Sequence, residues 1–252
     1  MPMCPLPIAA DGPCVSVVIP VWNEVATIAT VLDRVFVQSC VGEVIAVDDG
    51  STDGSLEVLR EMARREPRLR VECHGHNRGK GACLRTGFAL ASQSLVLVQD
   101  ADGEYDPAEY ASLILPITSG KADVVLGSRF CGAGMHRVLY YWHSVANRLL
   151  TWLSNMATDL NLTDMECGFK VFAKTVLDRI RIEEDRFGAE PELVAKVARL
   201  GVRIYEVPVS YHGRTYQEGK KIGWRDGLSA VRCIVRYNLR PQPKLPTTPP
   251  RD

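Results

Sequence analysis

The sequence predicts an α/β protein with a mostly parallel sheet flanked by helices. Short apolar runs rich in β-branched residues, such as VSVVI at residues 15–19, alternate with longer segments whose apolar residues recur at helical spacing. Strands separated by helices of about 10–15 residues are typical of βαβ units and a parallel sheet. Acidic residues follow several of the apolar runs. Ligands bind at the carboxyl ends of strands in such sheets, so these acids are candidate site residues.

The expected elements follow one another from residue 15 onward. Strands are expected at residues 15–19, 43–47, 68–73, 95–99 and 123–126, and helices at 26–37, 53–65, 80–91, 107–118, 138–156 and 224–239. Pro20 is expected to end the first strand, because proline cannot donate to a strand ladder. Asp53 is a candidate N-cap, and Pro107 stands in the first turn of its helix. The last two helices are amphipathic.

Composition excludes several classes of protein. The 252 residues are 46% apolar and 24% charged, and 30 basic side chains balance 30 acidic ones, so no nucleic-acid partner is expected. The eight cysteines form no C-x-x-C motif, and no apolar run approaches the ~18 residues of a spanning helix. Disulfide scaffolds, zinc modules and integral membrane proteins are not expected. We predict one domain over residues 14–240, between flexible tails at 1–13 and 241–252.

Two carboxylates one residue apart, Asp100 and Asp102, follow the apolar run at residues 95–99. Mg²⁺ or Mn²⁺ is bound by oxygen ligands, commonly one or two carboxylates together with phosphate oxygens. Glu104 lies on the same turn and is a third candidate ligand. Acidic surface loops and helix caps also carry this pattern. The position directly after a buried strand favours a metal site.

A second acidic loop, DDGSTDG at residues 48–54, follows the expected strand at 43–47. Carboxylates at such a strand end accept hydrogen bonds from a nucleoside. The alternative is a turn in which Asp48 or Asp49 leads into Gly50 at positive φ. The loop NRGKG at residues 77–81 precedes a helix, where glycines favour anion binding, but it lacks the Walker pattern.

Six motifs occur in order over residues 15–173, namely VSVVIPVWNE, VIAVDDGSTDGS, NRGKGACLRTGFALA, VQDADGEYDP, DVVLGSR and DMECGFKVF. Together they resemble glycosyltransferase family 2, the inverting enzymes with the GT-A (Rossmann-like) fold. The continuation from FGAEPELVAK onward resembles the subgroup of dolichyl- and polyprenyl-phosphate mannose or glucose synthases. The resemblance extends from Cys14 to Tyr237 and implies an enzyme that uses a nucleotide sugar.

The resemblance also implies roles for individual residues. The nucleotide site would comprise Pro20, Trp22, Glu24, Val47, Asp49, Asp100 and Ala101, and the metal ligands would be Asp100, Asp102 and Glu104. Arg129 would lie near the sugar or the acceptor phosphate. Arg214 and Lys220 would gather phosphates of the donor and the acceptor. The catalytic set implied is Asp102, Arg129, Glu190, Arg214 and Lys220.

The implied reaction leaves the acceptor open. A divalent ion, Mg²⁺ or Mn²⁺, would offset charge on the departing diphosphate. A polyprenyl phosphate is already an anionic nucleophile, so its position matters more than a base. A hydroxyl of a soluble glycan, peptide or metabolite needs a base, for which Glu190 is the candidate unless it is merely an acid at a helix N-terminus. A nucleotidyltransferase and a non-catalytic nucleotide-binding module are further alternatives.

The two amphipathic helices are candidates for membrane contact. Leu139, Trp142, Ala146, Leu149 or Leu150, and Leu153 form a stripe at helical spacing, typical of either a packed core or an interfacial helix. Residues 203–252 hold 10 basic and 4 acidic side chains, which favours an anionic surface. We expect peripheral binding at the cytoplasmic face of a membrane, either directly or through a membrane partner subunit.

Overall fold

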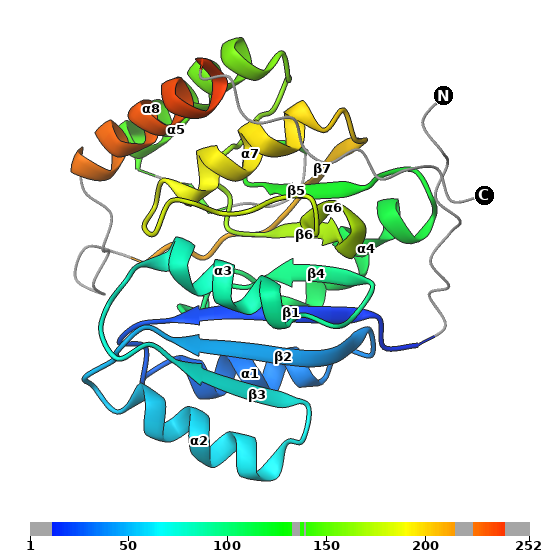
Figure 1. Cartoon of the computed structure of the whole chain (residues 1–252), viewed down its shortest axis with the longest axis vertical. Coiled ribbons are helices and arrows are strands. Elements are labelled where there is room, and N and C mark those ends of the chain that lie inside the picture. The colour runs from blue at the N-terminus through cyan, green and yellow to red at the C-terminus, as the bar shows by residue number, and fades with distance from the viewer. Residues whose placement is uncertain (1–11, 133–136, 139, 215–223, 240–252) are drawn as a thin grey trace.

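A mixed seven-stranded sheet forms the centre of the computed structural model, in the order β3-β2-β1-β4-β6-β5-β7 (Figure 1). Strand β6 runs antiparallel to β4 and β5, and the remaining pairings are parallel. The strands are β1 Val15–Val21, β2 Val41–Asp48, β3 Leu69–Cys73, β4 Leu95–Val98, β5 Val124–Ser128, β6 Lys170–Ala173 and β7 Ile204–Pro208. The predicted α/β class with a mostly parallel sheet is confirmed.

The structure describes residues 12–132, 137–138, 140–214 and 224–239. Nearly all of the expected tail at 1–13, and the whole of that at 241–252, therefore lie outside the described residues. Leu139 and Lys220 lie outside them too. The single domain over residues 14–240 stays a prediction.

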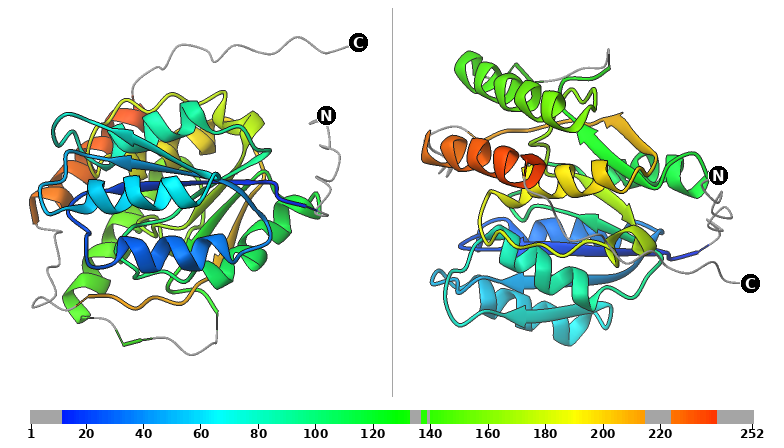
Figure 2. Two further views of the ribbon diagram at one scale, coloured as in Figure 1. Left: turned by 90° about the horizontal axis from the view of Figure 1, so that it is seen from below. Right: turned by 45° about the horizontal axis from the view of Figure 1, so that its top comes forward.

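Helices cover both faces of the sheet (Figures 1 and 2). α3 and α7 contact each other on one face, whereas α1 and α4 lie on the other, with α2 beside α1. α5 and α8 pack against α7 and against each other, farther from the sheet. The helices are α1 Ile28–Phe36, α2 Ser55–Arg65, α3 Lys80–Leu90, the 3₁₀ helix η1 Pro107–Glu109, α4 Tyr110–Thr118, α5 Tyr141–Thr158, α6 Lys174–Leu177, α7 Ala189–Arg199 and α8 Trp224–Leu239.

The register of the central strands places the acidic loops together. β1 and β4 are almost entirely buried, as expected for apolar runs in a sheet covered by helices on both faces. Val18 of β1 pairs with Val98 of β4, and Val21 pairs with Asp48 of β2. The carboxyl ends of these three strands therefore meet at one edge of the sheet.

Strand β1 continues through Pro20, where the sequence predicted its end. β4 pairs with β1 only as far as Val18. The missing N–H of Pro20 therefore interrupts no hydrogen bond to β4, and the strand extends to Val21 beside β2. The prediction was wrong because a proline ends a strand only where its N–H is needed for a ladder hydrogen bond.

Helix α2 begins two residues later than predicted. Gly54 holds the N-cap position with a φ of 98°, which favours glycine. Asp53 is therefore not the N-cap, but its Oδ1 accepts a hydrogen bond from the Ser55 backbone N–H at 3.0 Å. The predicted helix at 107–118 is likewise divided into η1 and α4.

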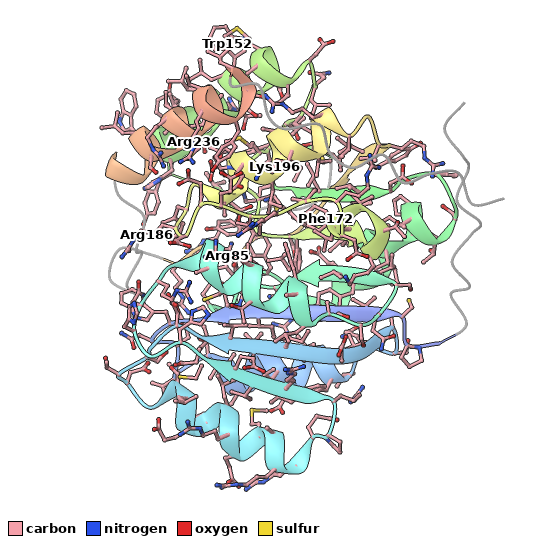
Figure 3. The ribbon with its side chains drawn as sticks, viewed as in Figure 1. Arg85, Trp152, Phe172, Arg186, Lys196 and Arg236 are labelled. Atoms are coloured by element: carbon pink, nitrogen blue, oxygen red, sulfur yellow. The ribbon has the colours of Figure 1, made fainter. Side chains whose placement is uncertain are left out.

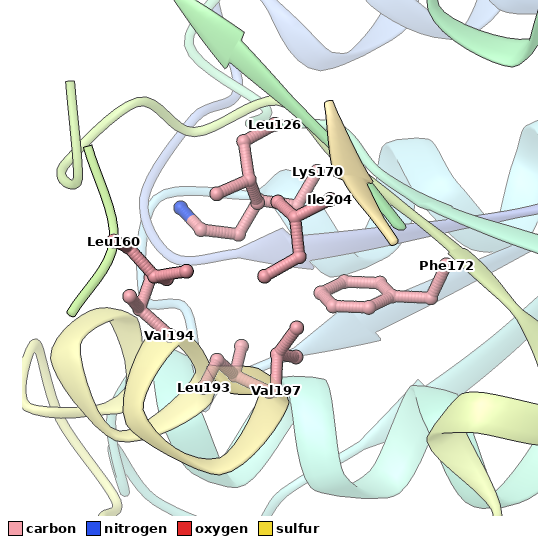
Figure 4. Close-up of a pocket in the computed structure, with 8 residues that line it drawn as sticks. All are labelled: Leu126, Leu160, Lys170, Phe172, Leu193, Val194, Val197 and Ile204. Atoms are coloured by element: carbon pink, nitrogen blue, oxygen red, sulfur yellow. The ribbon is translucent and has the colours of Figure 1, made fainter. Parts of the chain in front are cut away.

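The sequence analysis predicted no strand after residue 126, yet β6 and β7 complete the sheet, and α7 packs against it. Figure 4 shows apolar side chains of α7 facing side chains of the three neighbouring strands. Leu193, Val194 and Val197 of α7 meet Phe172 and Ile204 there, and the space between them is too small for a water molecule. This packing fixes α7, and with it Glu190, against the sheet.

Candidate active site

A cleft of about 440 Å³ opens at the carboxyl ends of β1, β2 and β4. All but two of the predicted site residues line it, namely Pro20, Trp22, Glu24, Asp49, Asp100, Ala101, Asp102, Glu104, Arg129, Glu190 and Arg214. Val47 is fully buried within β2 and does not line the cleft. Its side chain packs in the core and so does not contact the cleft, and its predicted role in the nucleotide site stays a prediction. Lys220 lies outside the described residues.

The turn after β1 presents an aromatic face to the cleft. Trp22 lines the cleft and is 41% exposed, and an indole ring is a side chain on which a base can stack. Asn23 next to it has a φ of 53°, and its side-chain oxygen accepts a hydrogen bond from the Thr52 backbone N–H at 2.8 Å. The Glu24 N–H donates to Ser55 Oγ at 2.8 Å. These bonds hold the loops after β1 and β2 together beside Trp22.

Asp49 is buried at the end of β2 and fixes the loop before α3. Its carboxylate accepts hydrogen bonds from the backbone N–H groups of Arg78, at 3.0 Å, and Gly79, at 2.6 Å. The Nδ1 atom of His74 lies 2.8 Å from the same carboxylate. Asp49 thus borders the cleft with both oxygens engaged, and its expected contact with a nucleoside stays a prediction.

The turn after β4 concentrates negative charge. Asp102 Oδ1 accepts a hydrogen bond from the Glu104 N–H at 3.0 Å, and Asp100 Oδ1 lies 2.7 Å from Lys80 Nζ. Burial, together with the nearby charges of Asp100 and Glu104, raises the pKa of Asp102 to about 7. The negative charges of this turn therefore outnumber the positive charges beside them.

This carboxylate pair fits a divalent cation. Hard cations such as Mg²⁺ and Mn²⁺ prefer carboxylate oxygens, and their charge would relieve the repulsion around Asp102. Gly168 packs against the same group, because a Cβ at this position would lie 2.1 Å from Asp100 Oδ2. Asp100 and Asp102 are thus the residues that would hold the ion.

Glu104 holds the segment after β7 in place. Its Oε2 accepts a hydrogen bond from the Tyr211 hydroxyl at 2.7 Å, and its Oε1 accepts one from the Arg214 N–H at 2.6 Å. The Arg214 guanidinium in turn donates to Glu24 Oε2 at 2.6 Å and to the Asp102 carbonyl at 2.7 Å. The metal role predicted for Glu104 would have to share both oxygens with these donors.

Glu190 lies between two lysines. Its Oε1 is 3.0 Å from Lys80 Nζ, and its Oε2 forms an ion pair with Lys170. Burial alone would raise the pKa of Glu190, but the two ammonium groups outweigh burial and the pKa is lowered. A carboxylate held in its ionised form is a weak general base. Glu190 also stands at the start of α7, where the alternative interpretation placed it.

Arg129, directly after β5, is fixed by a buried acid. Its Nε and one terminal nitrogen donate to the Asp164 carboxylate at 2.7 and 2.8 Å, and its backbone N–H donates at 3.0 Å. Asn147 of α5 donates to the same carboxylate at 2.9 Å. The guanidinium carbon lies 5.1 Å from the centre of the Tyr211 ring. Arg129 thus presents a positive charge to the cleft from a rigid support.

The two outer helices expose apolar side chains that we call the outer apolar surface. It consists of Trp142, Leu149, Trp152 and Met156 on α5, and Leu228, Val231, Val235 and Leu239 on α8. Figure 3 shows Trp152 at the outer edge of the molecule. The predicted stripe is divided, because Leu150 and Leu153 pack against the core whereas Trp142 is 77% exposed. Within the described part of the chain, no helix is long and apolar enough to span a membrane.

Several residues in or beside the cleft were not among the predicted site residues, and four of them bear on its chemistry. Lys80 and Lys170 pair with site acids, Glu166 and Tyr211 line the cleft. Lys80 belongs to the glycine-rich segment NRGKG, whose sequence lacks the Walker pattern and so does not specify an anion site. Glu166 was part of a family motif but carried no independent signal in its spacing.

Comparison with known proteins agrees with the motifs. The family model described as Glycosyl transferase family 2 matches residues 16–181. The undecaprenyl-phosphate mannosyltransferase of Micrococcus luteus is 27% identical over 232 residues, which cover 88% of this chain and 93% of the relative. The polyprenol monophosphomannose synthase of Mycolicibacterium smegmatis is 26% identical, with coverage of 82% and 80%. The undecaprenyl-phosphate 4-deoxy-4-formamido-L-arabinose transferase of Aeromonas hydrophila is 32% identical, with coverage of 83% and 63%.

A solved structure shares the fold. The glucosyl-3-phosphoglycerate synthase of Mycobacterium tuberculosis, in complex with Mn²⁺, UDP and glucosyl-3-phosphoglycerate, superposes with a TM-score of 0.70 at 22% identity. The match covers 92% of this chain and 82% of that one, and it confirms the predicted GT-A fold. The chain is a glycosyltransferase and belongs to glycosyl transferase family 2.

Proposed function

We propose that this enzyme transfers a hexose from a nucleotide sugar of the GDP-mannose or UDP-glucose type to a polyprenyl or dolichyl phosphate. The observation that carries the proposal is that Asp100, Asp102 and Arg129 all line one cleft. Such a cleft suits two phosphate-bearing substrates. The names of the relatives from M. luteus and M. smegmatis support a lipid phosphate as the acceptor.

The nucleoside of the donor binds, in this proposal, at the carboxyl ends of β1 and β2. Trp22 offers a flat face for the base or ribose, with Pro20 and Glu24 beside it. Asp49 keeps the loop at residues 77–79 in place next to this position.

The diphosphate of the donor lies beside Asp100 and Asp102. A divalent ion held by these two carboxylates supplies, when bound, the positive charge that stabilises the departing diphosphate. Arg214 adds a fixed guanidinium next to Asp102. Lys220 is proposed to contribute a further charge.

The state of Glu190 supports a phosphate acceptor. A hydroxyl acceptor requires a base, yet Glu190 is held between Lys80 and Lys170 with a lowered pKa. A phosphate monoester is already ionised at neutral pH and needs positioning instead. Arg129 is the candidate for that task, because planar guanidinium groups bind phosphate in a defined geometry.

The outer apolar surface is the proposed contact with the membrane that holds the acceptor. Aromatic and aliphatic side chains on an amphipathic helix enter the headgroup region of a bilayer. Leu149 and Trp152 on α5 and Leu228 on α8 are all more than half exposed. This surface supports peripheral binding at the cytoplasmic face of the membrane, directly or beside a membrane partner subunit.

The proposal is tested by following label from a radiolabelled nucleotide sugar into an organic phase. Purified enzyme is incubated with Mn²⁺ or Mg²⁺, undecaprenyl phosphate, and either GDP-mannose or UDP-glucose. We expect label in the organic phase with one of the donors, and its loss on chelation of the metal. Soluble labelled product formed with glycan or metabolite acceptors, without organic-phase label, would favour the hydroxyl-acceptor alternative instead.

A further inference from the structure

The order of strands along the edge of the sheet also orders the parts of the cleft. Strands β2, β1, β4, β6 and β5 lie side by side in this order (Figure 1). Asp49 follows β2, Trp22 follows β1, Asp100 lies just beyond β4, and Arg129 follows β5. Lys170, the first residue of β6, pairs with Val98 of β4 and with Leu126 of β5. The segment that enters β6 therefore lies between the diphosphate position and the acceptor position of the proposed function.

Glu166 occupies this segment and lines the cleft. Two residues farther on, Gly168 packs against Asp100, and two residues earlier, Asp164 holds Arg129. Glu166 is thus flanked on one side by the candidate metal site and on the other by the candidate acceptor arginine. In the proposed reaction the sugar moves from the diphosphate beside Asp100 toward the acceptor beside Arg129, and Glu166 lies in the segment that contacts both residues.

The carboxylate of Glu166 differs from its acidic neighbours. Asp100, Asp164 and Glu190 each pair with a lysine or an arginine. The Oε1 atom of Glu166 is buried, and the described part of the chain provides it with no hydrogen-bond partner. Burial, followed by the nearby charge of Glu190, raises the pKa of Glu166 to about 7. A buried oxygen without a donor is costly to the protein, and a ligand that supplies a donor removes that cost.

Only some parts of the two substrates could donate a hydrogen bond to the Glu166 carboxylate. A phosphate is an anion and a hydrogen-bond acceptor, so the ionised form of Glu166 repels it. In the proposed function the base and ribose bind at the carboxyl ends of β1 and β2, on the other side of Asp100 from Glu166. Sugar hydroxyls are neutral donors, and carboxylates bind them well.

We propose that Glu166 is a specificity-determining residue for the transferred sugar, whose hydroxyl groups donate hydrogen bonds to its carboxylate. The inference rests on the proposed function, because it assumes a nucleotide sugar in this cleft. It assigns to Glu166 the choice among hexoses that differ in the position or orientation of a hydroxyl.

The test compares Glu166→Gln and Glu166→Ala with wild type and with Glu57→Gln, a control on the exposed face of α2. Dissociation constants are measured with Mn²⁺ for UDP and UDP-glucose, for GDP and GDP-mannose, and for deoxy analogues of the preferred donor. We expect Glu166→Ala to weaken nucleotide-sugar binding about tenfold, and Glu166→Gln about threefold, with the nucleoside diphosphate bound as in wild type. With the deoxy analogue that lacks the recognised hydroxyl, the wild-type advantage should vanish.

Two results would overturn the inference. The first is an equal loss of affinity for the nucleoside diphosphate and the nucleotide sugar, which would mark Glu166 as structural. The second is unchanged donor discrimination in Glu166→Gln, the variant that preserves side-chain volume. If wild type transfers sugar to undecaprenyl phosphate in either case, only this inference fails. Absence of nucleotide-sugar binding by wild type would remove the proposed function and the inference together.

Discussion

The two sides of the cleft differ in how they hold several of their acids. On the nucleoside side, at the ends of β1 and β2, Asp48 and Asp49 accept hydrogen bonds from backbone N–H groups. On the transfer side, at the ends of β4, β6 and β5, Asp100, Glu190 and Asp164 pair with lysine and arginine side chains. Backbone-held acids set the shape of turns, whereas side-chain pairs set a balance of charge.

This difference indicates where substitutions should matter most. Turn geometry on the nucleoside side depends on short stretches of chain. The transfer side depends on charges brought together from distant elements, such as Lys80 of α3 and Glu190 of α7. A missing charge there leaves a buried partner without compensation, and that is costly in a protein interior.

The largest expected effect comes from Asp102→Asn. We expect kcat to fall about 1,000-fold or more, because a neutral amide holds a divalent ion poorly and the departing diphosphate loses its stabilisation. Initial rates with Mn²⁺ measure this loss, and thermal unfolding should show an intact fold. Asp33→Asn, on the exposed face of α1, is the matched control and should keep wild-type turnover. Normal turnover in Asp102→Asn would show that the transfer side does not depend on this carboxylate.

Lys170→Met tests the buried charge balance directly. Lys170 and Glu190 are both buried, so removal of the ammonium group should lower the free energy of unfolding by about 3–5 kcal/mol. Lys174→Met removes a more exposed partner of Asp178, and it should cost about 0.5 kcal/mol or less. Denaturant unfolding of both variants measures the contrast. Equal losses of unfolding free energy in Lys170→Met and Lys174→Met would mean that the buried ion pair stabilises the fold no more than the exposed one.

Glu166→Gln should change the pH dependence of stability. The pKa of Glu166 in the folded chain, about 7, lies above its ordinary value of 4.5. Between these pH values the folded chain binds more protons than the unfolded chain, so wild-type stability falls as the pH rises through this interval. Glutamine does not titrate. The advantage of the variant over wild type should therefore grow from pH 5 to pH 8, by about 1–3 kcal/mol.

Unfolding of wild type, Glu166→Gln and Glu57→Gln at pH 5, 6, 7 and 8 measures this growth. The exposed control should follow wild type at every pH. A constant difference between Glu166→Gln and wild type would contradict the raised pKa, and with it the picture of an uncompensated acid on the transfer side.

The smallest expected effect concerns the membrane. The transfer side connects to the outer apolar surface through α5, whose Asn147 donates to Asp164. Leu149→Ser should reduce binding to vesicles of anionic lipid about fivefold, because less apolar area enters the bilayer. Leu115→Ser on α4, at 61% exposure against 54% for Leu149, is the matched control and should bind as wild type. Equal losses would place the membrane contact elsewhere.

The sequence predicted the nucleoside side better than the transfer side, and the reason is physical. The strands β1, β2 and β4 are recognisable in the sequence as apolar runs. Asp49 follows β2, and Asp100 and Asp102 follow β4. Periodicity can find such residues because strand and loop are adjacent in the chain.

The transfer side offers no comparable signal. Lys170 begins a four-residue strand that is too short to show alternation, and its partner Glu190 belongs to another element. Glu166 became a candidate only once the topology placed β6 between β4 and β5 and the burial of its carboxylate was known. Contacts between distant elements decide these roles, and a single sequence does not display them.

The segment before α7 joins three parts of the molecule. Glu184 accepts hydrogen bonds from Arg232, Arg236 and Tyr237 of α8, at 2.6, 2.9 and 3.0 Å. Of the next residues, Asp185 accepts a hydrogen bond from Arg85 of α3, and Arg186 lines the cleft; Figure 3 labels Arg85 and Arg186.

A donor that immobilises this segment is therefore expected to restrain α8 as well, and because coupling between two sites is reciprocal, a surface that binds α8 would then strengthen donor binding by the same factor. Amide exchange in α8, measured with and without nucleotide sugar, would register this mutual restraint as slower exchange. Contact of α8 with the membrane would then strengthen donor binding before the lipid acceptor binds.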